Sequence, residues 1–196
     1  MGKFILICLI AYLAGSVNFA IIFFKLAGKG DPRLSFSGNA GTTNVYRQAG
    51  ILWAAIVFLL DIGRAIAVAA VAVYLLPASL VTWAGFFLIL GNSYPCFHGF
   101  KGGKGVANYL GFTAFISPWA AFLSTVAWTS AYWLYQIPFV SSLFMVLILA
   151  IGHDFSFNWT CSSVTGAAAT FTLILFNHRK NISETWKSKS ENKAVE

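Results

Sequence analysis

The chain has 196 residues, of which 58% are hydrophobic and 10% are charged. Its mean hydropathy of +0.74 and its long apolar runs exclude a soluble globular domain, because roughly 20 apolar residues are enough to cross the hydrocarbon core of a membrane. The formal net charge of +7 favours anionic ligands, but no long surface of basic and aromatic residues is present, which excludes a nucleic-acid-binding protein.

Hydropathy marks six apolar stretches in chain order, and the fourth contains the pair Ser117 and Pro118. Because a proline inside a helix removes a hydrogen bond, we divide this stretch there and predict seven helices. They cover residues 4–27, 51–76, 80–97, 106–116, 118–135, 139–153 and 159–176. The helix over residues 106–116 is too short to span a membrane alone, so we expect it to pack against protein.

Charge placement predicts the orientation. With seven helices and the N-terminus outside, the Lys and Arg residues between the helices face the cytoplasm, except for Lys3, as the positive-inside rule requires. We therefore predict an all-α integral membrane protein with seven transmembrane helices, the N-terminus outside and the C-terminus cytoplasmic. Residues 1–182 are expected to form a single membrane-embedded domain, and residues 183–196 a polar cytoplasmic tail.

This topology places three polar segments on the same membrane face. The first polar segment covers residues 28–50, the second polar segment residues 97–105 and the third polar segment residues 177–191. Segments that are far apart in the sequence could therefore build one cytoplasmic site.

The second polar segment combines glycines with cations in the run Lys101, Gly102, Gly103, Lys104 and Gly105. Glycine permits backbone conformations that direct successive N–H groups into one concavity, and the following helix would add the positive end of its dipole. This pattern predicts phosphate binding. It is no Walker A loop, because Gly105 stands where Ser or Thr would hold magnesium. A flexible basic turn is the alternative.

The first polar segment is rich in hydroxyl and amide side chains and lies between two apolar helices. The run from Ser37 to Arg47 has the composition expected where the backbone approaches a polar ligand closely. The guanidinium of Arg47 could hold a phosphate through two parallel N–H bonds. A well-capped turn uses the same residue types and is the alternative.

The third polar segment follows the last helix. His178 is a candidate general base or oxyanion partner, and Asn181 stands three residues later, so a helical continuation would place both on one face. The alternative is a basic stop after a terminal transmembrane helix. Asp61 and Arg64 are also three residues apart, inside the second helix, and we interpret them as a buried ion pair.

Together the three polar segments resemble the bacterial family of membrane acyltransferases that move a fatty acyl group from acyl-phosphate to glycerol 3-phosphate. The resemblance extends from about residue 10 to residue 181 and includes the break before Pro118. The first motif of the family is matched by Ser37, Gly38, Asn39, Gly41, Thr43, Asn44, Val45 and Arg47, the second by Tyr94, Pro95, Phe97 and residues 99–107, and the third by His178, Arg179, Asn181 and Ile182.

The resemblance implies an enzyme of phospholipid synthesis that forms lysophosphatidic acid and phosphate, as a monomer surrounded by membrane lipid in the bacterial plasma membrane. No carboxylate cluster lies on the cytoplasmic face, so we expect neither a metal nor a cofactor. The residues implied as catalytic are His178, Asn181, Ser37 and Lys104, and those implied for binding glycerol 3-phosphate and acyl-phosphate are Arg47, Asn39, Thr43, Asn44, Lys101, Gly102, Gly103, Gly105 and Arg179.

The chain also departs from the family pattern near these motifs. Asn92 stands where the family commonly has His, Phe36 where it has Gly, and Glu191 one position later than the family's Gly-x-Glu ending. Two alternatives to the enzyme therefore stay open. One is a divergent relative with an altered acceptor or little activity, and the other is a nonenzymatic small-anion transporter, which would need polar groups on both membrane sides.

Overall fold

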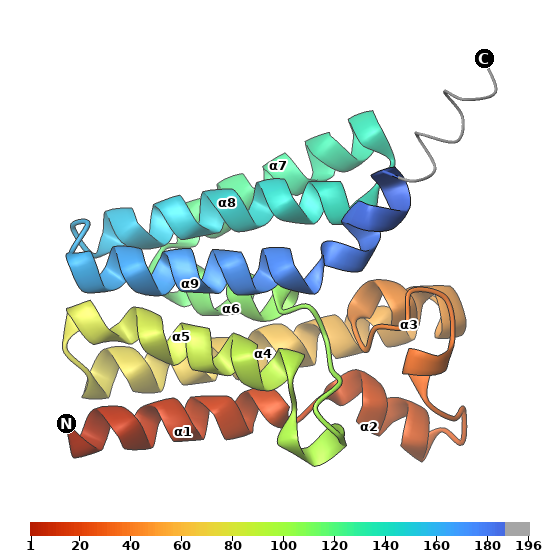
Figure 1. Ribbon diagram of the computed structural model, residues 1–196, viewed down its shortest axis with the longest axis horizontal. Coiled ribbons are helices and arrows are strands. Elements are labelled where there is room, and N and C mark those ends of the chain that lie inside the picture. Colours follow the sequence, from red (N-terminus) through yellow and green to blue (C-terminus); the bar gives the residue numbers. More distant parts are fainter. Residues whose placement is uncertain (187–196) are drawn as a thin grey trace.

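The computed structural model describes residues 1–186, and within this range every regular element is a helix (Figure 1). The α-helices are α1 (Gly2–Ser16), α2 (Phe19–Leu26), α3 (Thr42–Ala49), α4 (Ile51–Leu75), α5 (Ala78–Ser93), α6 (Val106–Ile116), α7 (Pro118–Tyr135), α8 (Pro138–Ser156) and α9 (Cys161–Asn177). Two short 3₁₀ helices lie in the loops, η1 (Pro32–Leu34) and η2 (Cys96–His98). A further helical segment covers residues 179–186.

The long helices lie side by side along one direction, and the parts of the polar segments that the structure describes gather at the end of the bundle shown on the right of Figure 1. Helix α5 packs against α1 and α9, and α6 packs against α4, α7 and α8. Buried apolar side chains fill these interfaces, and one core cluster includes Ile7, Ala65, Leu88 and Phe112. The packing therefore brings the loops that follow α2, η2 and α9 to one place.

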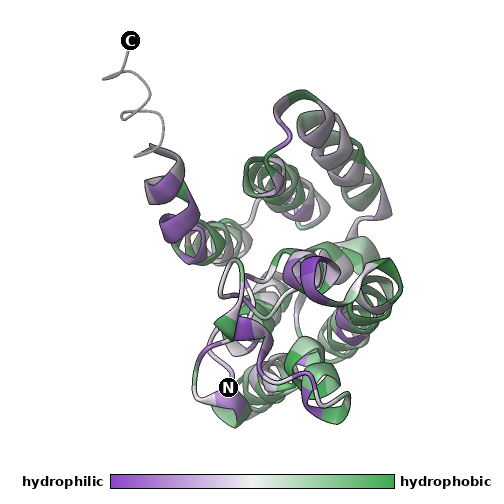
Figure 2. Cartoon of the chain, turned by 90° about the vertical axis from the view of Figure 1, so that its right-hand side faces the viewer, coloured by the Kyte–Doolittle hydropathy of each residue, from purple (hydrophilic) through white to green (hydrophobic). Residues whose placement is uncertain are grey.

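The helices have the lengths and surfaces of a membrane protein. Four stretches are long and apolar enough to cross a membrane, namely Gly2–Leu26, Ile51–Leu75, Ala78–His98 and Pro138–Ser156, whereas α6 and α9 are shorter apolar helices. Large apolar side chains such as Leu59 and Leu134 are exposed on the helices, and Figure 2, which looks at the end of the bundle, shows hydrophobic residues on many of the helices. An apolar surface of this extent needs lipid around it. The count of seven spans and their orientation stay predictions.

The first predicted helix is divided in the structure. Helix α1 ends at Ser16 and α2 begins at Phe19, and the side chain of Asn18 caps α2 by accepting a hydrogen bond from the backbone N–H of Ile21 at 3.1 Å. An amide side chain in this position satisfies an N–H group that has no partner within its own helix. The prediction of one unbroken helix over residues 4–27 was therefore wrong.

Two further predicted boundaries differ from the structure, and one is confirmed. The predicted helix over residues 80–97 ends at Ser93, and η2 follows Pro95 as a separate turn. The first polar segment contains α3, which its polar composition did not reveal. The break at Ser117 and Pro118 is present and separates α6 from α7.

Helix α6 lies inside the protein, as expected for a helix too short to span a membrane. Tyr109 and Phe112 are fully buried. Gly111 faces α4 so closely that an added Cβ would lie 2.7 Å from the carbonyl oxygen of Ile62. The short helix therefore has no continuous face toward lipid, and its first turn is held against the polar loops.

The division into a membrane-embedded domain and a tail after residue 182 stays a prediction. The boundary placed after residue 182 falls inside the helical segment 179–186, which is largely hydrophilic (Figure 2). Residues 187–196 of the expected tail, with Glu191, lie outside the described residues.

Candidate active site

A cavity of about 890 Å³ opens where the three polar segments meet. Its lining includes Ser37, Asn39, Thr43, Asn44 and Arg47 from the first segment, Gly103, Lys104 and Gly105 from the second, and His178 and Asn181 from the third. Segments far apart in the sequence therefore share one cavity, which is large enough for a small-molecule site. The lining does not include Lys101, Gly102 or Arg179.

Arg33 ties the first polar segment to the second. Its Nη1 donates to the carbonyl oxygens of His98 at 2.7 Å and Lys101 at 2.6 Å, while its Nε and Nη2 donate to the carboxylate of Asp31. A planar guanidinium suits this arrangement, because it has five N–H groups in a fixed geometry. Arg33 had no expected role, and the structure shows that it holds the backbone carbonyls of His98 and Lys101 at the start of the glycine run.

Asn44 organises the first polar segment from inside. Its Nδ2 donates to the carbonyl oxygens of Pro32, Ser35 and Asn39, at 2.7, 3.2 and 2.9 Å, and the residue is only 1% exposed. The N–H of Ala40 then donates to the carbonyl of Gly102 at 3.3 Å. The amide of Asn44 therefore holds the loop shape, although the residue also borders the cavity.

Two backbone N–H groups of the glycine run, which we expected to face a phosphate, instead donate hydrogen bonds to backbone carbonyls at the end of α5. The N–H of Gly102 donates to the carbonyl of Ser93 at 3.1 Å, and that of Gly103 donates to the carbonyl of Asn92 at 2.9 Å. A Cβ on Gly103 would lie 2.7 Å from Nδ2 of Asn92. The glycines therefore serve a close approach between the loop and the end of α5.

The N-terminus of α6 faces the cavity instead. Gly105, Val106, Ala107 and Asn108 all line it, and the first N–H groups of a helix have no partner within that helix. Gly105 has a φ of 90°, a conformation that favours glycine and turns the chain into the helix. Helix N-termini attract anions because these N–H groups and the helix dipole point the same way.

Of Arg47 and Lys104, the two cations in the described lining of the cavity, Lys104 is the less exposed. Its Nζ donates to Oδ1 of Asn181, so it joins the second polar segment to the third. Burial lowers the pKa of Lys104 to about 8 because the charged form loses solvation, and the nearby Glu184 carboxylate opposes this shift. Lys104 is therefore mostly protonated at neutral pH, and a bound phosphate would favour the charged form further.

His178 is held as a neutral base. Its ring Nδ1 lies 2.8 Å from the carbonyl oxygen of Ile174, so Nδ1 carries the proton and Nε2 keeps a free lone pair. The side chain is 2% exposed, and burial lowers the pKa of His178 to about 4. Beside it, Asn177 donates to the hydroxyl of Ser93 at 2.8 Å and fixes the end of α9 against α5.

A buried ion pair lies next to the cavity and contacts a residue of its lining. Arg64 lies 2.9 Å from the carboxylate of Asp61, which confirms the pair expected from the sequence. Arg64 also donates to Oδ1 of Asn108 at 2.6 Å and to the carbonyl of Val17. Asn108 borders the cavity, so the pair fixes the first turn of α6. Its partners could not be predicted, because they lie on other helices.

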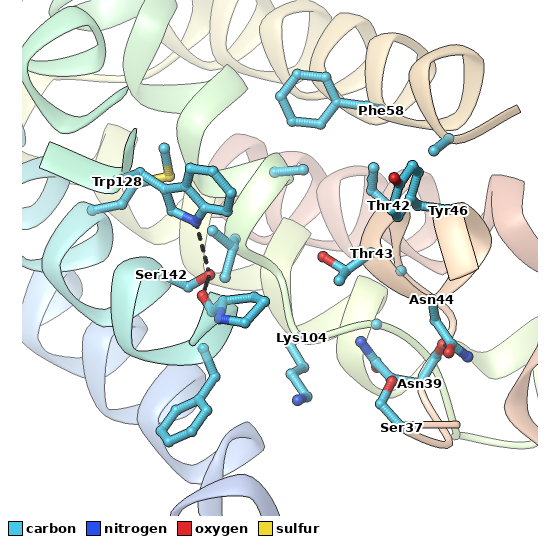
Figure 3. Close-up of a pocket in the computed structure, with 18 of the residues that line it drawn as sticks. Ser37, Asn39, Thr42, Thr43, Asn44, Tyr46, Phe58, Lys104, Trp128 and Ser142 are labelled. Carbon is cyan, nitrogen blue, oxygen red and sulfur yellow. Dashed lines mark hydrogen bonds between the residues drawn. The ribbon is translucent and has the colours of Figure 1, made fainter. Parts of the chain in front are cut away.

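The cavity continues into an apolar arm between α4, α6, α7 and α8. We define the apolar arm by the side chains of Phe58, Leu110, Thr125, Trp128, Thr129, Tyr132, Phe139, Ser142 and Met145. In Figure 3, Phe58 and Trp128 lie toward one end of the cavity and Ser37 and Lys104 toward the other. Sequence analysis missed the apolar arm, because an aromatic side chain that lines a cavity has the same hydropathy as one that faces lipid. It also missed Glu184 and Thr185, which line the polar end.

The cavity therefore joins a cationic end, with a neutral histidine and a helix N-terminus, to an apolar arm. Such an arrangement can hold a molecule that has an anionic head and a hydrocarbon tail, and it can place a base next to the head. Comparison with known proteins gives the same picture. The chain is matched over residues 5–188 by the family model described as Glycerol-3-phosphate acyltransferase.

Two curated relatives illustrate the match. The chain is 36% identical over 176 residues to glycerol-3-phosphate acyltransferase 1 of Rhizobium johnstonii, a match that covers 89% of this chain and 84% of that protein. It is 39% identical over 184 residues to the glycerol-3-phosphate acyltransferase of Jannaschia sp. strain CCS1, which covers 93% and 89%.

Solved structures of PlsY, an integral membrane glycerol 3-phosphate acyltransferase, have a similar fold. The glycerol 3-phosphate form of that protein gives a TM-score of 0.88 at 32% identity, over 95% of this chain and 94% of the other. Its lysophosphatidic acid form gives a TM-score of 0.84 at 31% identity, over 95% and 93%.

Proposed function

Because this chain belongs to the glycerol-3-phosphate acyltransferase family, we propose that it transfers a fatty acyl group from acyl-phosphate to a hydroxyl of glycerol 3-phosphate, giving lysophosphatidic acid and inorganic phosphate. The main support for this proposal is the shape and lining of the cavity. Its cationic end, formed by three polar segments, continues into an apolar arm. A phosphate group fits the first part and a fatty acyl chain the second.

The phosphate groups of the substrates bind at the cationic end. Lys104 and Arg47 supply charge there, Ser37 supplies a hydroxyl, and the first turn of α6 supplies backbone N–H groups. Asn39 and Thr43 line the same region and offer further polar contacts. Lys101 and Arg179 lie outside the lining, and Arg179 stacks on the ring of Phe176 with its guanidinium carbon 3.9 Å from the ring centroid. We therefore assign these two cations to steering anions toward the cavity.

Transfer is direct and needs no covalent acyl-enzyme. The hydroxyl oxygen of glycerol 3-phosphate attacks the carbonyl carbon of acyl-phosphate, a new ester bond forms, and the bond between that carbon and the phosphate oxygen breaks. The hydroxyl proton passes to Nε2 of His178 or to a substrate phosphate oxygen. Lys104 and Asn181 stabilise the carbonyl oxyanion and the leaving phosphate. Holding the activated acyl-phosphate and its acceptor hydroxyl together in one cavity can contribute on the order of 7–11 kcal/mol in favourable cases.

The site works at the cytoplasmic face in this proposal. Seven spans with the N-terminus outside would place all three polar segments on that side, in agreement with the positive-inside rule. The chain acts as a monomer in a bacterial plasma membrane, within one membrane-embedded domain over residues 1–182. In a background that lacks Cys8, Cys96 and Cys161, maleimide labelling of Lys101→Cys and of Lys3→Cys, from one side of sealed vesicles and then from both, tests this orientation.

Phosphate release tests the activity. Purified protein is given palmitoyl-phosphate and glycerol 3-phosphate, and we expect release that needs both substrates. Lys104→Met should lower kcat/KM by about 100-fold or more, because a charge at the reacting groups is lost. Lys180→Met, an exposed lysine outside the cavity lining, should retain activity.

The same assay separates the alternatives. Binding of glycerol 3-phosphate without release would identify a divergent, inactive relative. Anion flux across proteoliposomes without acyl transfer would identify a transporter, and either result would overturn the proposal.

A further inference from the structure

The apolar arm contains Ser and Thr hydroxyl groups, and those of Thr125, Thr129 and Ser142 are each hydrogen-bonded within their own helix. The hydroxyl of Thr125 donates to the carbonyl of Ala121 at 2.9 Å, and that of Ser142 donates to the carbonyl of Pro138 at 2.9 Å. Thr129 bonds in the same way to the carbonyls one turn before it. Polar atoms that are already paired leave mainly methyl and methylene groups for a ligand, so the arm suits a hydrocarbon chain.

The apolar arm covers similar lengths of two helices. Its side chains lie over residues 125–132 of α7 and 139–145 of α8. With a rise of 1.5 Å per residue, each stretch is about 10 Å long. Phe58 and Trp128 lie at the inner end, away from Lys104 and Ser37 (Figure 3), and Thr125 stands one helical turn before Trp128 in α7. The arm therefore ends at a definite depth, next to the largest side chain in its wall.

The indole of Trp128 is fixed at this inner end. Its Nε1 donates to the hydroxyl of Ser142 on α8 at 3.3 Å, a bond drawn in Figure 3. One face stacks on Tyr132 with ring centroids 5.2 Å apart and an angle of 15°. Trp128 also packs against the buried core cluster that contains Met145 and Leu149. Because α7 and α8 both hold it, the ring cannot turn aside without breaking a hydrogen bond and a stacking contact.

We propose that Trp128, held by Ser142, sets the acyl-chain length that the enzyme prefers. The indole limits the depth to which a chain can enter the apolar arm, and methylene groups beyond that depth find no further protein contact. The inference rests on the proposed function, because it names the part of the same cavity that selects the acyl donor. It concerns selectivity alone, since Trp128 lies away from Lys104 and Ser37 (Figure 3).

The test measures kcat/KM with a series of saturated acyl-phosphates from octanoyl to palmitoyl, with glycerol 3-phosphate in excess. In the wild-type protein, each methylene that fills the arm should raise kcat/KM by up to about fourfold, and the rise should stop at one chain length. In Trp128→Ala, the rise should continue to longer chains. Ser142→Ala keeps the indole but removes its hydrogen bond to α8. In this variant the chain length at which kcat/KM stops rising should be less sharply defined.

Trp133→Ala is the matched control, because Trp133 lies on the same helix, is 77% exposed and does not line the cavity. Its profile should match the wild type. If Trp128→Ala fails to fold, Trp128→Phe and Ser142→Ala carry the test. If kcat/KM depends on acyl-chain length in the same way in all variants, the inference is overturned and the proposed function stands. If the wild-type protein releases no phosphate with any acyl-phosphate, the proposed function itself is overturned.

Discussion

At the scale of single residues, Lys104 gives the enzyme a pH dependence that an exposed lysine would not. Its pKa is lowered to about 8 because burial disfavours the charged form. Lys104 therefore carries its proton below about pH 8 and loses it above. If Lys104 binds the phosphate of glycerol 3-phosphate as proposed, this attraction is present at neutral pH and weakens as the pH rises through that value.

We predict that KM for glycerol 3-phosphate is constant near pH 7 and rises by up to about tenfold per pH unit above pH 8. The window starts at pH 7, where a phosphomonoester with a second pKa near 6 is already mostly a dianion. His178, whose pKa is lowered to about 4, stays neutral across the window and should not contribute. Steady-state kinetics between pH 7 and pH 9.5 check this.

Lys104→Arg serves as the comparison, because an arginine stays charged across the window and should remove the rise. A wild-type KM that does not change up to pH 9.5 would contradict the role given to Lys104.

Phe36 adopts a backbone conformation that side chains rarely take. Its φ is 53°, in the left-handed region, and the sequence resemblance leads us to expect Gly at this position. A side chain in that region costs about 1–2 kcal/mol. Its ring is 70% exposed, so no contact within the described protein offsets that cost. Ser37, the next residue, still lines the cavity.

At the scale of elements, the contact between α1 and α5 depends on two glycines. A Cβ on Gly15 would overlap the carbonyl oxygen of Leu88, and one on Gly91 would overlap the carbonyl oxygen of Tyr12. Small residues allow helix backbones to approach closely within a membrane. This approach places Asn92, the next residue on α5, at the edge of the cavity.

We predict that Gly91→Ala destabilises the protein by about 1–3 kcal/mol, because backbone atoms cannot move aside as a flexible side chain can. Gly63→Ala is the matched control, since Gly63 lies within α4 and an added Cβ would have no neighbour within 4 Å. That variant should be neutral or slightly more stable. Thermal unfolding in one detergent compares them, and equal midpoints would show that the contact is looser than described.

The elements also show what sequence could and could not predict. Pro118 carried a strong local signal, so the break between α6 and α7 was predicted correctly. Asn18 is a weaker sign of a helix boundary, because it is a single amide inside an apolar run. The division between α1 and α2 was therefore not predicted. Helix α3 was missed because turns and amphipathic helices use many of the same polar residues.

At the scale of the whole molecule, topology and motifs together predicted the cationic end of the site. Arg47, Lys104 and His178 come from three separate segments, and alternating helix direction brings those segments to one end of the bundle. The apolar arm could not be predicted, because Trp128 and the exposed Trp133 look alike in sequence. Only the packing of α7 on α8 distinguishes them.

A crystal structure with glycerol 3-phosphate bound is the most direct test of one shared anion site. We expect the phosphate within hydrogen-bonding distance of Lys104 and Arg47, facing the first turn of α6, with the glycerol hydroxyl directed toward His178. A phosphate held instead by Lys101 or Arg179, outside the cavity, would contradict the account.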